Sequence, residues 1–600
     1  MKKIFSIIAA SLCMVSCVDT VILPDDKIVD EDMWQTKSDV SGMVACAYNQ
    51  LKDESLMRNY IVWGDFRSDE LMVSSSAALT NGSAFKVDLS QIYSLNILPS
   101  NAFTNWNALY SAINYCNLVM ERAHEVIAID PNYTEGDYLT DISKVKALRA
   151  LCYFYLVRVF RDVPVSTKAY TNSEQDTQLE QKAPAEVLAL CIQDLKEAEV
   201  DAMSSSTYGD WRDKGYMTRD AICALLADIY LWRASVNHDA ADYQACIDYC
   251  DKVIASKKNA HVLDPRKNEV EQDYYLASAE DYYNEVFSTS QLTGGSRPFG
   301  QNSEESIFEV QYSSASSTNY RRTNNAGLVQ MYYIYNNKQN GATPYLKTTS
   351  DYAVANGSSV GTNFFKNTVD VRRKEFIYDA DNTANDQYLV RKFIGEMSYM
   401  NEGSSISTSS SREVGAVYSN WILYRLTDVM LMKAEAMVQI YEMTEKNEEN
   451  AEEMADYLRA AFDIVDFVNR RALPEGATSG FLSYNLYKDQ MEKLVLMERA
   501  RELCFEGKRW FDLMRYNYRH VEGVQYDKTF AQIGGGYVQN YKDMLTMAMA
   551  IGKKYSSTAM VSKMPTEPYL YWPINTVQMD VNDKLVQNRV WRSSSSTERN

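Results

Sequence analysis

Apolar residues recur at intervals of three and four over much of the first 260 residues, and this period constrains the fold more than any other feature of the chain. Over residues 142–160 the spacing puts the apolar side chains on one face of a helix, and Pro164 stops its continuation. Residues 185–198 repeat the pattern. The chain is therefore predicted to fold mainly as long amphipathic helices.

A helical hairpin is predicted to begin near residue 218. Thr218 is suited to the N-cap position, His238 and Asp239 mark a turn, and a second segment with helical periodicity follows. Two helices in about 35 residues match the tetratricopeptide period. A similar pair is predicted at residues 429–440 and 451–471. Stacked hairpins of this kind form a curved scaffold, which usually binds partners.

The helical pattern breaks between residues 260 and 420. This stretch is rich in Ser, Asn, Gly and Tyr, with short β-like pieces at residues 307–310 and 388–390. Long irregular segments inside compact proteins are usually functional. The predicted fold class is thus mostly α, with tetratricopeptide-like hairpins as a scaffold and a loop-rich, partly β-containing region that faces a ligand.

The acidic balance of the chain disfavours one class of partner. Its 61 basic and 80 acidic side chains give a net charge of −19, which repels phosphate backbones and argues against nucleic-acid binding. With 46% hydrophobic residues over 600 positions, the chain is globular and long enough for several domains or sub-domains.

The N-terminal residues predict export. Lys2 and Lys3 precede an apolar stretch that is too short to span a bilayer, so residues 1–16 are interpreted as a signal peptide. Ser16 and Cys17 end this stretch in a pattern similar to the bacterial lipobox, in which the cysteine is acylated and becomes the mature N-terminus. Acyl chains on Cys17 would hold the protein on a membrane. The alternative is an ordinary signal peptide that is cleaved nearby, with Cys17 incidental.

Cysteine and histidine usage gives little support for a metal site. The cysteines beyond Cys17 lie mostly in apolar helical runs without a CxxC motif, which favours buried thiols, although an exported protein could form disulfides. Only 4 histidines are scattered along the chain, so an all-histidine zinc site is not expected.

Several segments together resemble the SusD/RagB family of Bacteroidetes surface lipoproteins. KALRALCYFYLVRVFRDVP at 146–164 resembles a family hallmark, with Arg161 where glycine is usual. ERARELCFEGKRWFDLMR at 498–515 is close to another. Further similar segments, in the family's order, lie at residues 185–198, 424–436 and 569–591.

The resemblance implies an α-helical capture protein without chemistry of its own. Members of the family cap a SusC-like TonB-dependent transporter at the outer membrane, held by a lipid anchor and facing the cell exterior, and they capture glycans or sometimes peptides for import. The domains expected on this basis are the signal peptide 1–16, a SusD-like helical region at 17–235, a hairpin with connecting loops at 236–300, and a C-terminal RagB/SusD domain at 301–600.

The charged motif around Gly507 is predicted to be structural. Its acids and arginines alternate at helical spacing, which is typical of an ion-pair network at a helix junction and which would lower the carboxyl pKa values. A glycoside hydrolase needs one acid with a raised pKa, about 5–10 Å from its partner. The residues concerned are Glu498, Arg499, Glu502, Glu506, Arg509 and Asp512.

Two further motif matches are weak. Residues 357–361 fit G-x-S-x-G, but polar loop residues flank them instead of the strand and helix that a nucleophile elbow requires. Residues 379–383 begin like a calcium loop but lack its glycine and distal glutamate, which leaves a structural calcium ion open and predicts no other cofactor.

Glycan recognition needs exposed aromatic faces and planar polar groups. Seven tryptophans lie in family-like motifs or on apolar helix faces and are expected in the core: Trp34, Trp106, Trp232, Trp421, Trp510, Trp572 and Trp591. The other two lie in polar, turn-like surroundings, and tyrosines cluster with arginines in the middle segment. The candidate ligand residues are therefore Trp63, Trp211, Tyr282, Tyr283, Arg297, Tyr320, Arg321, Asn324, Tyr332 and Tyr333.

Three functional interpretations are weighed from the sequence, beside that of a purely structural assembly factor, which would lack any ligand site. A glycan-capturing lipoprotein leads. The abundance of Tyr beside Arg also allows a peptide ligand, because a planar guanidinium pairs with carboxylates as well as hydroxyls. A surface glycoside hydrolase ranks far behind both.

Overall fold

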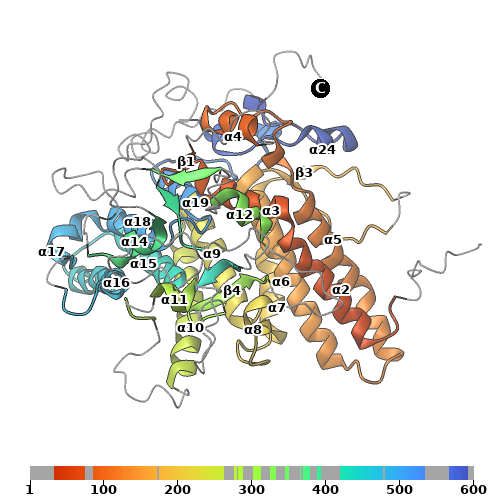
Figure 1. Ribbon diagram of the computed structural model, residues 1–600, viewed down its shortest axis with the longest axis horizontal. Coiled ribbons are helices and arrows are strands. Elements are labelled where there is room, and N and C mark those ends of the chain that lie inside the picture. The colour runs from red at the N-terminus through yellow and green to blue at the C-terminus, as the bar shows by residue number, and fades with distance from the viewer. Residues whose placement is uncertain are drawn as a thin grey trace, which may run out of the picture.

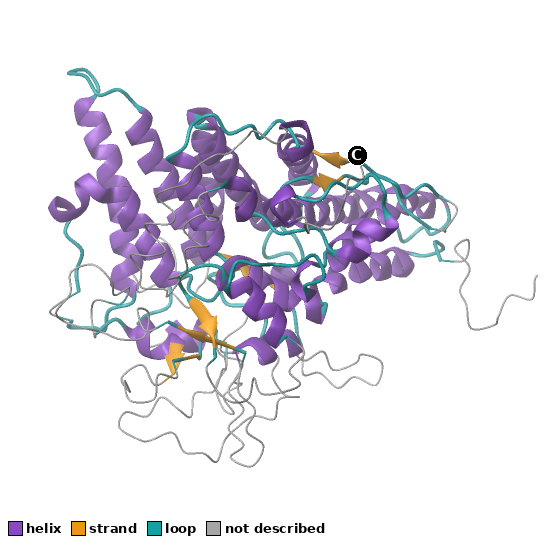
Figure 2. Cartoon of the chain, turned by 90° about the horizontal axis from the view of Figure 1, so that it is seen from above, coloured by secondary structure: helices purple, strands orange, loops and turns teal. Residues whose placement is uncertain are grey.

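Helices make up most of the computed structural model, and the strands are few and short (Figure 2). The structure describes residues 33–74, 85–171, 175–262, 276–279, 282–287, 302–312, 325–332, 345–349, 365, 369–378, 388–393, 419–477, 480–533 and 566–591.

Four long helices pack side by side at one end of the molecule, on the right of Figure 1. They are α2 (Lys37–Asn49), α5 (Asn107–Arg122), α6 (Glu135–Phe160) and α7 (Pro184–Asp201). The predicted helices at 142–160 and 185–198 are confirmed within α6 and α7. Helix α6 begins earlier than predicted because Thr134 and Asp137 form a capping box at its N-terminus.

The predicted hairpins are also confirmed. Helix α9 (Arg219–Asn237) has Thr218 at its N-cap and ends at His238, whose left-handed φ of 55° reverses the chain into α10 (Ala240–Val262). Helix α10 packs against α15 (Leu426–Met443), which packs against α16 (Ala451–Arg471). Helix α18 (Met491–Glu502) contacts both α15 and α16 on the left of Figure 1, and α19 (Arg509–Arg519) follows it.

The strands pair two by two, always antiparallel, in the parts of the chain that are described. The pairs are β1 (Leu71–Val73) with β5 (Leu346–Thr348), β2 (Val163–Pro164) with β3 (Gln181–Lys182), β4 (Ser306–Val310) with β8 (Trp421–Arg425), and β6 (Ile377–Tyr378) with β7 (Leu389–Val390). The β-like pieces predicted in the middle segment thus correspond to β4 and β7.

Short helices connect these layers. They are α3 (Glu54–Ile61), α4 (Lys86–Tyr93), α8 (Arg212–Gly215), α11 (Tyr282–Val286), α12 (Ala326–Tyr332), α14 (Val371–Phe376), α17 (Tyr484–Tyr487), α20 (Phe530–Ile533), α23 (Glu567–Leu570) and α24 (Thr576–Val581). A π-helical turn, η3 (Val62–Phe66), follows α3. Short 3₁₀ segments lie at η2 (Gln50–Lys52), η5 (Ala102–Thr104), η6 (Ala123–Ala128), η9 (Lys488–Gln490) and η10 (Arg589–Trp591).

The core contains the residues that the sequence assigns to it. All seven tryptophans that were expected inside are buried. The cysteines from Cys46 onward are free thiols, and all of them except Cys46 are buried, as expected of small apolar side chains. None of the helices in the described ranges combines the length and the apolar character that crossing a bilayer requires.

Candidate functional site

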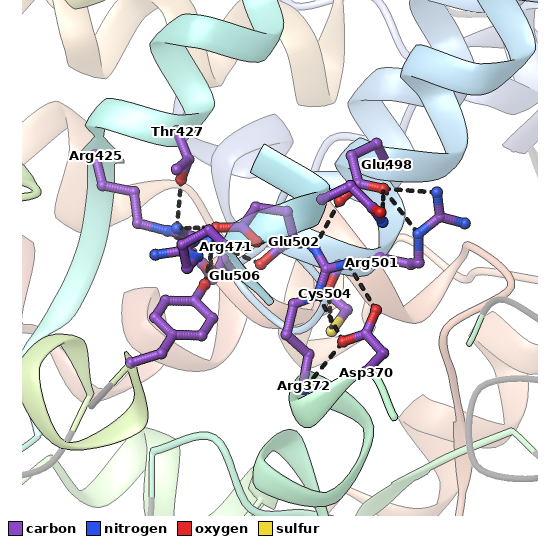
Figure 3. A network of polar contacts seen from close by, with 12 residues as sticks. Asp370, Arg372, Arg425, Thr427, Arg471, Glu498, Arg501, Glu502, Cys504 and Glu506 are labelled. Atoms are coloured by element: carbon purple, nitrogen blue, oxygen red, sulfur yellow. Dashed lines mark hydrogen bonds and ion pairs between the residues drawn. The ribbon is translucent and has the colours of Figure 1, made fainter. Parts of the chain in front are cut away.

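The motif at 498–515 forms a buried charge network where α18 ends (Figure 3). Glu502 lies at its centre and is fully buried. Its carboxylate accepts hydrogen bonds from Arg425 Nη1 at 2.6 Å and Arg372 Nη1 at 2.9 Å, and it also contacts Arg471. The network joins α18 to β8, α14 and α16, three elements that are distant in the sequence.

Two neighbouring glutamates extend the network. Glu498 pairs with Arg372 at 2.7 Å and with Arg501 at 2.6 Å. Glu506 pairs with Arg425 at 2.8 Å and with Lys392 at 2.6 Å. The predicted ion-pair network is therefore confirmed.

The network's carboxylates are held in the charged form. Burial raises the pKa of Glu498, Glu502 and Glu506, but the arginines around them outweigh burial and leave each pKa below its ordinary value. A general acid for glycoside hydrolysis needs the opposite shift. These residues therefore suit a structural role.

A second contact fastens the turn between α18 and α19 onto η3. Gly507 has a left-handed φ of 73°, and its N–H donates to Asp65 Oδ2 at 2.7 Å. A Cβ atom on Gly64 would lie 2.0 Å from the Gly507 carbonyl oxygen, so the two backbones meet where no side chain fits. Arg509 Nε donates to Asp69 Oδ1 at 2.9 Å and strengthens the same junction.

Trp63 belongs to this junction, and the expectation of an exposed ring there is wrong. Its ring is fully buried, and its indole N–H donates to the Phe103 carbonyl at 2.8 Å. The polar neighbours that suggested a surface turn are themselves buried in η3. Trp63 has no free face on which a ligand could stack.

Tyr282 and Tyr332 are buried too, which corrects the same expectation for them. The Tyr282 hydroxyl donates to Glu502 Oε1 at 2.8 Å, so this side chain completes the charge network. The Tyr332 ring is stacked on Phe393, with 6.3 Å between the ring centroids. The faces and edges of both rings contact other residues of the protein interior.

Other candidates lie outside the described residues. Nothing is described for the side chain of Tyr283 or for Cys17, Arg297, Tyr320, Arg321, Asn324 and Tyr333, nor for the motifs at 357–361 and 379–383.

Among the candidates whose side chains are described, Trp211 is the one that the structure leaves accessible. Its side chain is 49% exposed, the largest exposure of any tryptophan in the described ranges. The ring leans on Tyr216 with 5.9 Å between centroids and 37° between planes, and Tyr216 in turn packs edge-on against the buried Tyr48 at 4.9 Å. The exposed ring is thus backed by two further aromatic rings.

The loop before α8 holds this ring in place. The buried carboxylate of Asp213 accepts the backbone N–H groups of Tyr208 at 2.9 Å and Gly209 at 2.6 Å. Gly209 has a φ of 67°, a left-handed conformation that favours glycine. A Cβ atom on Gly215 would lie 2.9 Å from Trp211 Cε3, so the indole rests directly on the backbone of α8.

Polar groups surround the exposed ring. The Arg212 guanidinium lies 4.2 Å over the Tyr208 ring and pairs with Asp210 at 2.8 Å. Lys144 Nζ lies 3.5 Å from the Tyr208 hydroxyl and 2.8 Å from Asp141 Oδ1. We call Trp211, Tyr208, Tyr216, Arg212 and Lys144 together the Trp211 platform.

Sequence reasoning found only Trp211 among these residues. The available signal was local: Tyr208, Gly209, Arg212 and Tyr216 surround Trp211 within a few positions. Lys144 lies in α6 and reaches the platform only through the fold. A flat aromatic face beside planar and charged donors can stack on an apolar ring surface while it hydrogen-bonds to the edge of that ring.

Two family models match the chain. Residues 24–231 match the model described as starch-binding associating with outer membrane, and residues 304–591 match the model of the SusD family.

Curated relatives match the chain over differing shares of their length. A SusD-like protein P38 from Formosa agariphila is 24% identical over 525 residues, which cover 85% of this chain and 90% of the relative. A SusD-like protein from Bacteroides ovatus is 22% identical over 261 residues, or 42% of this chain and 44% of the relative.

Solved structures share the fold. A SusD homolog from Bacteroides thetaiotaomicron superposes with a TM-score of 0.62 at 18% identity, covering 93% of this chain and 98% of that one. A laminarin-binding SusD-like protein gives 0.58 at 18% identity, covering 92% and 99%. At these identities the likeness concerns the fold.

Proposed function

Because this chain belongs to the SusD family, we propose that it is a cell-surface lipoprotein that captures glycans and delivers them to a SusC-like TonB-dependent transporter. The outer-membrane association in one family description and the laminarin binding of a structural relative support this proposal. Acylation of Cys17 supplies the anchor in this scheme.

The Trp211 platform is the observation that carries the proposal. An exposed indole backed by Tyr216, with the Arg212 guanidinium nearby, provides what a pyranose ring needs: a flat apolar face and donors for the hydroxyls. The net charge of −19 disfavours nucleic acid as a competing ligand.

Capture is proposed to occur without cleavage. The glutamates of the family motif have lowered pKa values, so none is suited to protonate a leaving group. Burial raises the pKa of Asp65 and Glu70, but both are enclosed, at 0% and 1% exposure, and cannot reach a substrate.

Trp211→Ala is expected to weaken glycan binding by about 10- to 100-fold, because truncating a central aromatic contact commonly costs about 2 kcal/mol or more. The measurement is isothermal titration against a panel of soluble polysaccharides, with reducing-end release assayed on the same samples. Phe481→Ala is the matched control, since Phe481 is also 49% exposed but lies far along the chain, after α16.

The panel separates the alternatives. Release of reducing ends would show an enzyme. Glycan binding that is equally strong in wild type and Trp211→Ala would show that the binding site does not include the platform. Retention of peptides in place of every glycan would favour the peptide-binding alternative.

The anchor and the partner need a separate test. Wild type is expected to incorporate labelled palmitate and to copurify with the transporter from outer membranes, whereas Cys17→Ser is expected to incorporate none. Equal labelling of the two proteins would contradict the assignment of Cys17.

A further inference from the structure

A groove of about 420 Å³ lies at the opposite end of the molecule from the Trp211 platform. In Figure 1 the strand β3, which contributes to the groove, lies in the upper part of the picture, whereas α8, which carries the platform, lies in the lower part. Four segments form it: the end of α6, the strand β3, the helix α20, and the C-terminal stretch from Trp572 to Asn588. A volume of this size lies in the range of small-ligand sites, about 300–1,000 Å³.

Arg161 lies between two residues that line the groove, Phe160 and Asp162. It has a φ of 67°, a conformation that costs energy for any residue except glycine. Its guanidinium is fully buried and donates to the carbonyls of Lys528 at 2.8 Å and Gln525 at 2.7 Å and to Glu567 Oε1 at 3.1 Å. The strained backbone conformation therefore places a side chain that links the segment before α20 to the end of α6.

Phe530 is placed by the same contacts. The Arg161 guanidinium lies 4.2 Å over its ring, and its backbone N–H donates to Asp162 Oδ2 at 2.5 Å. The ring is partly exposed and lines the groove. A fixed aromatic ring is thus available in the groove.

Trp572, beside the end of α6, carries a donor without a hydrogen-bond partner among the described residues. Trp572 lines the groove, and its backbone N–H pairs with the Val159 carbonyl at 2.9 Å at the end of α6. Its indole N–H is buried and has no hydrogen-bond partner among the described residues. A buried donor without a partner costs about 1–3 kcal/mol, so a ligand that accepts from it would recover that energy.

Acceptors surround the mouth of the groove. The carboxylates of Glu180 and Asp583 are exposed there. Lys584 spans the rim and donates to the Gln178 carbonyl at 2.8 Å. Gln181 donates to the Asp162 carbonyl at 2.8 Å and accepts the Val586 N–H at 2.7 Å, which closes β3 against the C-terminal stretch.

We propose that this groove binds one pyranose residue of a glycan, separately from the Trp211 platform. Phe530 provides the ring face, the Trp572 indole N–H donates to a ring or hydroxyl oxygen, and the carboxylates of Glu180 and Asp583 accept from hydroxyl groups. The inference rests on the proposed glycan-binding function and adds a second contact to it. Two contacts at opposite ends would let one polymer chain engage the protein twice, which raises the overall avidity.

The test follows the tryptophan indole N–H signals by NMR in the full chain labelled at tryptophan. Trp572→Phe and Trp211→Phe assign the two signals. The probes are the methyl glycosides of glucose, galactose, mannose and N-acetylglucosamine. At least one probe is expected to shift the Trp572 signal saturably, and to do so equally in Trp211→Ala.

Two variants probe the groove itself. Phe530→Ala is expected to weaken the Trp572 response about tenfold and to leave the Trp211 response unchanged. The double variant Glu180→Gln with Asp583→Asn changes only exposed carboxylates and is expected to weaken the Trp572 response several-fold, so the test does not depend on how well Phe530→Ala folds.

Each outcome decides one claim. A Trp211 response without a Trp572 response overturns the groove and leaves the platform standing. A Trp572 response without a Trp211 response supports glycan binding in the groove and contradicts glycan binding at the platform. No response of either signal to any of the probes overturns both.

Discussion

Replacing Glu502 with Gln is expected to lower the free energy of unfolding by about 3–5 kcal/mol, because it leaves buried arginines without their counter-charge. Glu502 is fully buried and is shared by Arg372 and Arg425, which are fully buried, and by Arg471, whose side chain is 4% exposed. Glutamine keeps the shape of the side chain and one acceptor oxygen. The loss therefore reports the charge and not a cavity.

Denaturant unfolding of the two proteins measures the difference. Glu448→Gln is the matched control, since Glu448 is exposed near the start of α16, and it should change stability by less than about 0.5 kcal/mol. A loss below about 1 kcal/mol for Glu502→Gln would show that Glu498 and Glu506 can hold the arginines without it. Stability alone would then not explain the charged residues of the motif at 498–515.

The repeating parts of the chain could be predicted because local physics decides them. Helix α16 has the bounds that its periodicity predicts, and the turn at His238 lies where the pattern breaks. The charge network followed from alternating acids and arginines around Gly507. The helices and the turn depend on residues within a few turns of one another, whereas Glu502 finds its arginine partners in distant segments.

The exposure of aromatic rings could be predicted only in part. Trp211 lies in a polar turn and is exposed. Trp63 has equally polar neighbours, but Asp65 and Arg67 are buried through partners at Gly507 and Leu570, more than 400 positions away. Local polarity cannot distinguish a surface turn from a buried polar junction, because the partners of the junction come from the distant chain.

The groove could not be predicted at all. Its walls come from four separate segments, and its geometry depends on the positive φ of Arg161. The departure from glycine at this position was visible in the sequence. What the arginine does there depends on Lys528 and Glu567, which only the fold brings to it.

The free energy of unfolding is expected to depend on pH through the ionisation of Asp65. Burial raises the pKa of this carboxyl from 3.8 to about 7, although the N–H groups of Gly507 and Arg509 lower it. The neighbouring Glu506 charge raises it further. The folded state therefore binds a proton at Asp65 that the unfolded state has already released.

Stability should accordingly fall as the pH rises from about 4 to about 7, because the folded state holds more protons than the unfolded state in this window. A shift from 3.8 to about 7 corresponds to a loss on the order of 4 kcal/mol. Asp428 acts oppositely: burial raises its pKa, but Lys508 and Arg499 bring it down to about 2, so its contribution is lost only in stronger acid. The difference in the free energy of unfolding between the wild type and an Asp65 variant isolates the contribution of Asp65.

Asp65→Asn is therefore expected to gain stability relative to wild type as the pH rises, by about 3–4 kcal/mol between pH 4 and pH 8. Asparagine resembles the protonated carboxyl: its oxygen, in the place of Asp65 Oδ2, can accept from the Gly507 N–H at 2.7 Å and from the Tyr332 hydroxyl at 3.5 Å. Urea unfolding of both proteins across this range measures the difference. Parallel curves would show that Asp65 is already ionised in the folded protein, held by the backbone N–H groups of the Gly507 turn.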